Sequence, residues 1–392
     1  MRLLLVSFFY EHDHGGAEMV AREARRLMTE KLGWEIDVLC LAGGPDRGAG
    51  IHRIPPPLWW PGSQWYKHAI LFLQNSQLDR WFLGAVQRAR VRAKDYDAIF
   101  CPDMNALVLA RQLAETAGKP LVTWCQEVVP KRVDEQSTRT LLAPMMNRWL
   151  TARDRPWREA LAASRRVASV SDFITRRTRK YVGASQGSGQ FVTLYPPLEE
   201  YFVNAQRPPA RTEADARVLF YGRLSTEKGI DLLLRAWRKL NLPATLSILG
   251  MDGPLRAEVE DIAAARDDIT LLDPVPHAEV PALIAAHDIV CCPSRVEESL
   301  CRTVLEARWL ERTIVTTQSG AIPEVIRDYP LAHSINVRTD DLEAANHLAK
   351  ALQNAIQSPR AFKAPQRAAE SDFRKRFLPE TFVVGIRALF DD

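Results

Sequence analysis

Short apolar runs alternate with longer segments of helical periodicity throughout the first half of the chain. The runs are RLLLVSFFY, EIDVLCL, DAIFCP, PLVTWCQ and RVASVSD. A continuous apolar run of this kind is typical of a strand that is buried on both faces of a parallel sheet. Because parallel neighbours are joined through helices, this order predicts a doubly wound α/β sheet.

A second series of the same kind begins near Arg217. Its runs are RVLFYGRL, ATLSILG, DITLLD, DIVCCPS and TIVTT. Residues 191–216, between the two series, are rich in proline and polar residues and predict a linker. A chain of 392 residues is long enough for roughly two or three domains, so we expect one sheet in each half. Neither half contains the G-x-G-x-x-G motif of nicotinamide- or flavin-binding sheets.

The composition argues against several classes of protein. The formal net charge is only +4 and the usual nucleic-acid-binding motifs are absent, so we expect no nucleic-acid partner. No apolar run approaches the ~20 residues that span a bilayer, and the N-terminal run is short and lacks a signal-peptide cleavage site. We therefore expect a cytoplasmic protein.

The six cysteines include no C-x-x-C pair, and five lie in or directly after apolar runs, which argues against metal or redox chemistry.

Residues 288–325 carry two glutamates near the start of a predicted helix. An apolar strand, Ile289–Cys292, precedes a polar loop with Glu298, and Glu306 follows inside the helix LCRTVLEARWL. In an open α/β sheet, ligands bind where a strand ends and a helix begins, and the helix N-terminus favours an anion. Carboxylates would oppose a bare phosphate, but they accept hydrogen bonds from hydroxyl groups. The segment therefore predicts a phosphorylated, hydroxyl-rich ligand such as a nucleotide sugar, with two solvated glutamates as the alternative.

Residues 221–237 carry two cations beside another predicted helix start. Arg223 follows the strand RVLFYG, and Lys228 comes just before the helix. An arginine can hold a phosphate through two nitrogens, and a lysine adds a compact charge. The segment predicts a diphosphate site; the alternative is an exposed pair of Arg223 with Glu227.

These two segments resemble motifs of the retaining glycosyltransferases of family 4 (glycosyl transferases group 1). PS-RVEES-LCRTVLEA resembles the family's E-x7-E signature, and GRLSTEKG resembles its G-R-L-x-x-E-K-G motif. The resemblance is close over residues 215–326 and looser over the first 200 residues. The sequence departs from the family pattern in that Leu300-Cys301 replaces Phe-Gly, Glu311 replaces Gly, Thr313 replaces Pro, and Gly320-Ala321 replaces Gly-Gly.

The resemblance implies the GT-B fold, in which two Rossmann-like doubly wound domains face a central cleft. Residues 1–205 would form the N-terminal acceptor-binding domain, and residues 206–370 would bind the nucleotide sugar. Residues 371–392 would form a C-terminal helix that crosses back to the first domain.

The resemblance also implies roles for the donor-site residues. Arg223 and Lys228 would bind the donor diphosphate and neutralise the leaving group. Glu298 would position the hydroxyls of the donor sugar, and Glu306 would hold the nucleotide ribose. The predicted catalytic residues are Glu298, Arg223 and Lys228. The whole predicted donor site is Gly15, Gly16, Gly222, Arg223, Lys228, Glu298, Ser299, Leu300, Cys301 and Glu306.

The acceptor side of the predicted site belongs to the first half of the chain. Gly15-Gly16 lets the backbone approach a ligand closely, and in the family this loop touches the donor diphosphate and borders the acceptor. Cys125-Gln126 stands where many relatives have a histidine near the sugar. The candidates for the contact with the acceptor or the sugar are His14, Gln126 and Glu127. The alternatives are a simple turn for Gly15-Gly16, a solvated histidine for His14 and a surface glutamate for Glu127.

Two further stretches bear on the acceptor. Residues 55–82 contain four Trp, and residues 131–180 contain 13 Arg and Lys against 5 Asp and Glu. An aromatic, apolar segment near a basic surface predicts peripheral contact with the anionic inner face of a membrane, which would suit a lipid-linked acceptor. The alternative is that the Trp residues pack in the core and the Arg residues form a solvated face.

Together the residues and the resemblance predict a retaining glycosyltransferase of the hexosyltransferase type. It would move a sugar from a nucleotide diphosphate sugar to a hydroxyl of a glycan, a glycolipid or another small acceptor, in the synthesis of cell-surface polysaccharide or glycoconjugate. We expect no metal cofactor, because no D-x-D-type pair lies near the predicted phosphate site and Arg223 and Lys228 supply the cations. Two alternatives remain: a GT-B enzyme that is not a transferase, such as a nucleotide-sugar epimerase, and a degenerate GT-B binding module without turnover.

Overall fold

The computed structural model describes residues 1–11, 16–41, 48–54, 83–87, 91–129, 154–185, 187, 189–206, 215–336, 341–357 and 364–391. The chain forms two compact units, one of Met1–Pro197 together with Arg376–Asp392, and one of Leu198–Lys375. The domain limits expected from the sequence lie at 205/206 and 370/371, and the two units divide at 197/198 and 375/376.

The first unit contains a seven-stranded sheet in the order β3-β2-β1-β4-β5-β6-β7, and all its pairings are parallel. Leu3, Leu4, Leu5 and Val6 are fully buried, as expected for a strand that is covered on both faces. The strands are β1 Arg2–Val6, β2 Glu35–Leu41, β3 Ile51–Ile54, β4 Ala98–Cys101, β5 Leu121–Cys125, β6 Arg166–Ser169 and β7 Phe191–Thr193. The helices of this unit include α1 Gly16–Leu32, η1 Ala93–Asp95, α4 Leu107–Ala117, α6 Asp172–Val182 and α15 Pro379–Ala388.

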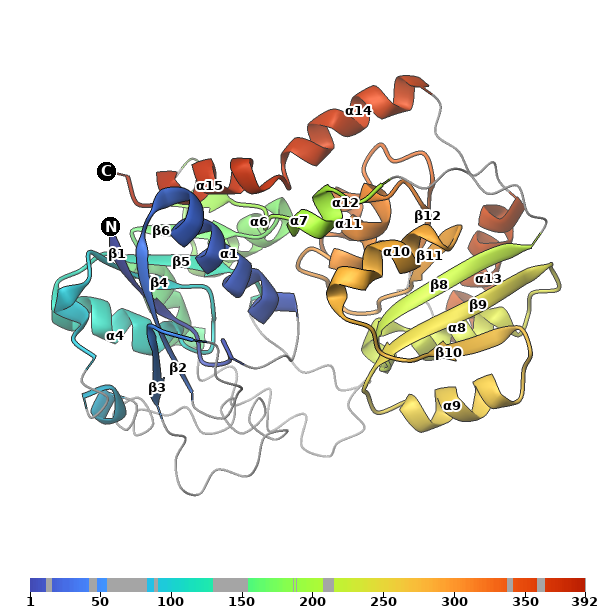
Figure 1. The fold of residues 1–392 in the computed structure, drawn as a ribbon, viewed down its shortest axis with the longest axis horizontal. Coiled ribbons are helices and arrows are strands. Elements are labelled where there is room, and N and C mark those ends of the chain that lie inside the picture. The colour runs from blue at the N-terminus through green and yellow to red at the C-terminus, as the bar shows by residue number, and fades with distance from the viewer. Residues whose placement is uncertain are drawn as a thin grey trace. The chain divides into compact units, whose positions relative to one another are not determined.

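The last helix of the chain, α15, packs on the first unit and contacts α1 (Figure 1). The fully buried ring of Phe382 lies 5.3 Å from the ring of Trp124, measured between centroids. Gly385 permits a close approach, because an added Cβ there would lie 2.6 Å from Leu194 Cδ1. The chain therefore returns to the unit in which it began after completing the second unit.

The second unit contains a six-stranded parallel sheet in the order β10-β9-β8-β11-β12-β13. Leu233 and Trp237 of α8 lie in one buried cluster with Leu348 and Leu352 of α13. The strands are β8 Ala216–Arg223, β9 Ala244–Met251, β10 Ile269–Leu272, β11 Ile289–Cys292, β12 Thr313–Thr317 and β13 Ala332–Ile335. The helices are α7 Glu200–Val203, η2 Thr226–Lys228, α8 Ile230–Trp237, α9 Arg256–Ala264, η3 His277–Glu279, α10 Val280–Ala285, α11 Arg302–Trp309, α12 Ile322–Val325, α13 Asp341–Gln357 and α14 Ala364–Lys375.

In both sheets the strand order reverses between the first strand and the fourth. β1 pairs with β4 in the first unit, and β8 pairs with β11 in the second. The helices that follow two such strands leave on opposite faces of the sheet, which opens a crevice beyond the carboxyl ends of the strands. In the second unit this place follows Arg223 and Cys292, where the loops with Lys228 and Glu298 begin. The predicted fold class, two doubly wound α/β sheets, is confirmed.

Five of the six cysteines lie in strands, and Cys301 directly precedes α11. All six are buried free thiols. No helix in the described part of the chain is long and apolar enough to cross a membrane.

Candidate active site

Lys228 and Glu298 meet at the switch point of the second sheet. Lys228 Nζ lies 2.7 Å from Glu298 Oε1. The two loops can approach because residue 229 is a glycine: a Cβ added there would lie 2.0 Å from the carbonyl oxygen of Pro293. Both residues were predicted for the donor site, but the ion pair between them was not.

Several contacts hold Glu298 in place. The Ser294 hydroxyl donates to Glu298 Oε1 at 2.6 Å, and the Ala321 N–H donates to the Glu298 carbonyl oxygen at 2.8 Å. Gly320 has φ +61°, and an added Cβ there would lie 2.2 Å from the same carbonyl oxygen. The β12–α12 loop thus supports the backbone of Glu298, and Ser294 supports its side chain.

The charged form of the Lys228 amine is favoured in this environment. Burial lowers the pKa of the Lys228 amine, but the nearby carboxylate of Glu298 outweighs this effect, and the pKa lies above its usual value. The amine is therefore charged at neutral pH and can attract a phosphate once it is released from Glu298.

Glu306 lies in a buried polar network and is only 1% exposed. Its Oε1 accepts a hydrogen bond from Arg302 Nε at 3.0 Å and lies 3.4 Å from His277 Nε2. Its Oε2 accepts a hydrogen bond from the Tyr221 hydroxyl at 2.9 Å. Burial raises the pKa of the Glu306 carboxyl, but Arg302, His277 and Tyr221 together lower it below its usual value.

The carboxylate of Glu306, which was predicted to hold the ribose, is therefore buried and already hydrogen-bonded to protein side chains in this structure. Arg302 is also held by Glu199, with Nη2 2.5 Å from Glu199 Oε2. Arg302 precedes Glu306 by four residues on one helix, so their contact could be expected from the spacing. His277 and Glu199 lie far away in the sequence, and no local pattern indicates that they join this network.

Arg223, the other predicted phosphate ligand, has a half-exposed side chain. Its Nη1 lies 3.7 Å from Glu227 Oε2, with 52% of the arginine side chain and 40% of the glutamate side chain exposed. This is the pair that was considered as the alternative to phosphate binding. Arg223 and Gly222 end β8, so they lie at the same edge of the sheet as Lys228.

The segment Ser299-Leu300-Cys301 leads from Glu298 into α11. Leu300 and Cys301 are buried, and Cys301 has the left-handed value φ +65° in the place where the family pattern has glycine. Its Sγ lies 3.4 Å from Cys292 Sγ, so the side chain points to β11. Contact with Cys292 and burial raise the pKa of the Cys301 thiol well above its usual value.

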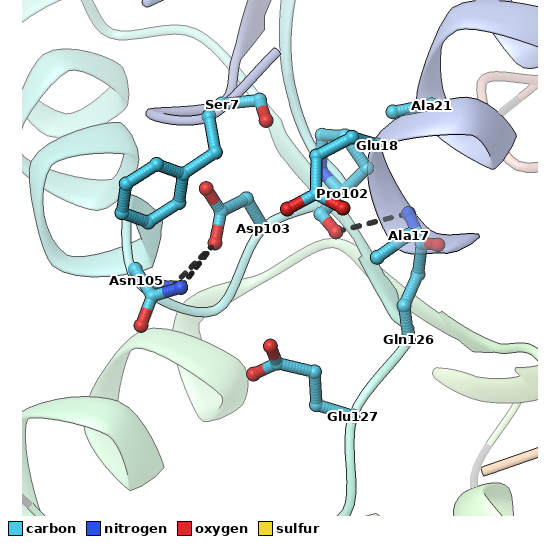
Figure 2. Close-up of a pocket in the computed structure, with 10 residues that line it drawn as sticks. Ser7, Ala17, Glu18, Ala21, Pro102, Asp103, Asn105, Gln126 and Glu127 are labelled. Carbon is cyan, nitrogen blue, oxygen red and sulfur yellow. Dashed lines mark hydrogen bonds between the residues drawn. The ribbon is translucent and has the colours of Figure 1, made fainter. Parts of the chain in front are cut away.

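The first unit has a cavity of about 130 Å³ at the carboxyl ends of β1, β4 and β5 (Figure 2). Gln126 and Glu127, two of the acceptor-side candidates, both line it. The Gln126 Nε2 donates to the Pro102 carbonyl oxygen at 3.2 Å. Figure 2 shows the carboxylates of Glu18 and Glu127 pointing toward the same space from opposite sides.

Asp103 lines the same cavity and was not among the candidates. Its Oδ2 accepts a hydrogen bond from the Phe8 N–H at 2.9 Å, and its Oδ1 accepts one from the Asn105 N–H at 2.8 Å. It therefore joins the loops after β1 and β4. Its position directly after the apolar run DAIFCP is a signal that could have identified it.

Some predicted positions lie outside the described residues. These are His14 and Gly15, the Trp-rich residues 55–82 and the first part of the basic stretch, residues 131–153. Gly16 is described and begins α1. Within the described ranges, no group of three or more His, Cys, Asp or Glu side chains is arranged to hold a metal ion.

Comparisons with known proteins match each half of the chain to a glycosyltransferase family. Residues 215–358 match the family described as Glycosyl transferases group 1, and residues 14–188 match the family described as Glycosyltransferase Family 4. The chain is 28% identical to Spore coat protein SA of Bacillus subtilis over 228 residues, which are 53% of this chain and 60% of that protein. It is 24% identical to D-inositol 3-phosphate glycosyltransferase of Pseudarthrobacter chlorophenolicus over 349 residues, 80% of this chain and 76% of the relative.

The length matched differs widely between relatives. The match to Alpha-D-kanosaminyltransferase of Streptomyces kanamyceticus, 29% identical, spans 28% of this chain and only 30% of that protein. The match to Spore coat protein SA likewise spans less than two thirds of that relative.

Solved structures share the whole architecture at low sequence identity. Sucrose-phosphate synthase from Thermosynechococcus elongatus superposes with a TM-score of 0.73 at 17% identity, over 100% of this chain and 98% of that chain. HepE of Anabaena in complex with UDP superposes with a TM-score of 0.69 at 16% identity, over 99% of each chain. The chain therefore belongs to the family 4 glycosyltransferases (glycosyl transferases group 1), and its fold is the GT-B fold expected from the sequence.

Proposed function

We propose that the protein is a retaining glycosyltransferase, of the hexosyltransferase type, that uses a nucleoside diphosphate sugar as donor. The observation that carries this proposal is the meeting of Lys228 and Glu298 at the switch point of the second sheet. A cation suited to a diphosphate and a carboxylate suited to sugar hydroxyls are in direct contact there. Membership of the family, and the likeness to HepE, which was crystallised with UDP, support a nucleotide-sugar donor.

In the proposed reaction, the bond between C1 of the sugar and the diphosphate oxygen breaks. A bond between C1 and the acceptor oxygen forms on the same face of the ring, and the leaving diphosphate takes the proton of the acceptor hydroxyl. Lys228 and Arg223 neutralise the charge that develops on the diphosphate, and Glu298 holds the sugar through its hydroxyls. These roles require neither a protein nucleophile nor a metal ion, so we expect transfer to continue in the presence of EDTA.

The acceptor in this proposal is a glycan, a glycolipid or a lipid-linked precursor used for cell-surface polysaccharide or glycoconjugate. The cavity of the first unit supports a hydroxyl-bearing acceptor, because Glu18, Asp103 and Glu127 all line it. Carboxylates accept hydrogen bonds from sugar hydroxyls and repel phosphate groups.

A thermal-shift screen with UDP, GDP, ADP, dTDP and their common sugar conjugates tests the donor site. Ligand at 100 times its dissociation constant should stabilise the protein by about 2.7 kcal/mol. We expect one nucleotide family to stabilise the wild type and to fail with Arg223→Ala, while Arg238→Ala, which removes an exposed arginine of the same unit, keeps the shift. No shift with any nucleotide would overturn the proposal.

Retention is tested separately on the product. With the donor identified, the anomeric proton of the new glycosidic bond is followed by NMR in the presence of an acceptor. We expect the anomeric configuration of the donor to be kept. An inverted product, or an epimerised donor without transfer, would contradict the proposed reaction.

A further inference from the structure

In the protein without the sugar donor, the two charged groups that are proposed to bind it, Lys228 and Glu298, form an ion pair with each other. Lys228 Nζ lies 2.7 Å from Glu298 Oε1, and the Glu298 side chain is only 11% exposed. A diphosphate that binds Lys228 draws it away from Glu298. A largely buried carboxylate that loses its cation needs another hydrogen-bond donor to remain ionised in place.

The hydroxyl of Ser294 is this hydrogen-bond donor. Its hydroxyl donates to the same Glu298 oxygen at 2.6 Å, whereas its other acceptor, the Glu227 carbonyl oxygen, lies farther away at 3.3 Å. Ser294 is fully buried, and its own carbonyl oxygen accepts a hydrogen bond from Thr317 Oγ1 at 2.6 Å. The hydroxyl is therefore fixed in position before any ligand arrives.

Of the two partners, Lys228 is the one that can move. The backbone of Glu298 is held by the Ala321 N–H and closed in by Gly320, where a Cβ would lie 2.2 Å from the Glu298 carbonyl oxygen. The Lys228 side chain is 29% exposed and has a flexible four-carbon stem. Within the described residues, Glu298 Oε2 accepts no hydrogen bond, so this oxygen is open to a sugar hydroxyl.

We propose that Ser294 is a positioning residue for transfer: it holds Glu298 while the donor diphosphate takes Lys228, so that Glu298 meets the sugar in a defined place. The proposal rests on the proposed function, because it assigns Lys228 to the diphosphate and Glu298 to the sugar. Ser294 acts only through Glu298 and does not itself touch the donor.

The exchange is tested first with Glu298→Gln, which removes the charge that competes for Lys228 and keeps an acceptor for Ser294. Wild type and variant are titrated by calorimetry with UDP, GDP, ADP and dTDP. We expect the diphosphate that binds wild type to bind Glu298→Gln about fivefold tighter, which is near the upper end of what release from a partly exposed ion pair provides. The matched control Glu297→Gln removes an exposed charge one residue away and should leave the affinity unchanged.

The role of Ser294 is tested with Ser294→Ala. The matched control is Ser169→Ala, because Ser169 is also buried, its hydroxyl has no hydrogen-bond partner within the described residues, and it lies in β6 of the first unit, away from the predicted diphosphate segment. In Ser294→Ala the affinity for the bare diphosphate should stay within about twofold, since the phosphate contacts are intact, while kcat falls about tenfold with the loss of a hydrogen bond to a charged group. The preference for the sugar conjugate that wild type binds over the bare diphosphate should fall as well. A general loss of protein stability would not lower the affinity for the sugar conjugate while leaving the affinity for the bare diphosphate unchanged.

The outcomes distinguish this proposal from the one on which it rests. If wild type binds one of the diphosphates but Glu298→Gln binds it no tighter, the exchange is wrong and the donor site remains. Equal kcat in Ser294→Ala and Ser169→Ala overturns the positioning role. If wild type binds none of the four diphosphates, the proposed function fails together with the exchange. If Ser294→Ala does not fold, Ser294→Cys, which keeps a side chain of similar size and weakens the hydrogen bond, takes its place in the same kcat comparison.

Discussion

At the scale of single residues, Lys228 is the group on which departure of the diphosphate depends in the proposed reaction. Replacing it with alanine should lower kcat by about 10²–10³, by analogy with the loss of one donor to a developing oxyanion. Glu298 keeps the pKa of the amine above its usual value, so the loss should be the same throughout the neutral pH range. Lys239→Ala, which removes an exposed lysine of the same unit, should retain full activity. A loss below tenfold in Lys228→Ala would contradict the assigned role.

Gly320 allows the β12–α12 loop to close on Glu298. An alanine there combines a left-handed φ with a Cβ 2.2 Å from the Glu298 carbonyl oxygen, so the loop must shift. We expect a loss of unfolding free energy clearly above the ~1–2 kcal/mol of left-handed strain alone, together with a loss of transfer. Gly118→Ala is the control, because Gly118 has φ +65° but nothing within 4 Å of an added Cβ. Equal losses in urea unfolding of the two variants would exclude the clash as the cause.

At the scale of elements, α11 carries a pH-dependent contribution to stability through Glu306. The pKa of this carboxyl is lower in the folded protein than its usual value, so the folded state binds fewer protons than the unfolded state. The stabilisation is fully present above the unfolded pKa of about 4.3 and is lost as the pH falls through the folded value. In urea unfolding, the difference between wild type and Glu306→Gln should shrink below that pH. For Glu258→Gln, an exposed glutamate of α9, it should stay small at every pH.

The elements also show what the sequence can and cannot predict. Strands such as Leu3–Val6 are encoded by local runs, and the loops of Lys228 and Glu298 follow from where such runs end, so the sheets and the edge of the site were predictable. The pairing of Lys228 with Glu298 depends on which strands become neighbours, and it joins residues 70 positions apart. The contact of Tyr221 with Glu306 joins residues 85 positions apart. The periodicity of a single helix or strand cannot predict a contact between two elements.

At the scale of the whole molecule, the chain leaves its first unit near Pro197 and re-enters it at Arg376. Lys228, Glu298 and Ser294 all lie within Leu198–Lys375, whereas α15 packs on the first unit. A change in the packing of α15 should therefore alter the stability of the first unit without altering the proposed donor site.

Phe382→Ala tests whether α15 stabilises the first unit without affecting the proposed donor site. The ring is fully buried against Trp124, so its removal should cost about 3–5 kcal/mol of unfolding free energy. Val384→Ala, on the same helix, removes a side chain that is 71% exposed and should change the stability by no more than about 0.5 kcal/mol. Urea unfolding followed by tryptophan fluorescence measures both losses, and calorimetry on the folded variants measures their affinity for nucleoside diphosphates. That affinity should equal the wild-type value in both, because no donor-site contact of Lys228 or Glu298 involves α15 in the described part of the chain. A folded Phe382→Ala protein that no longer binds the nucleotide would show that α15 also supports the donor site.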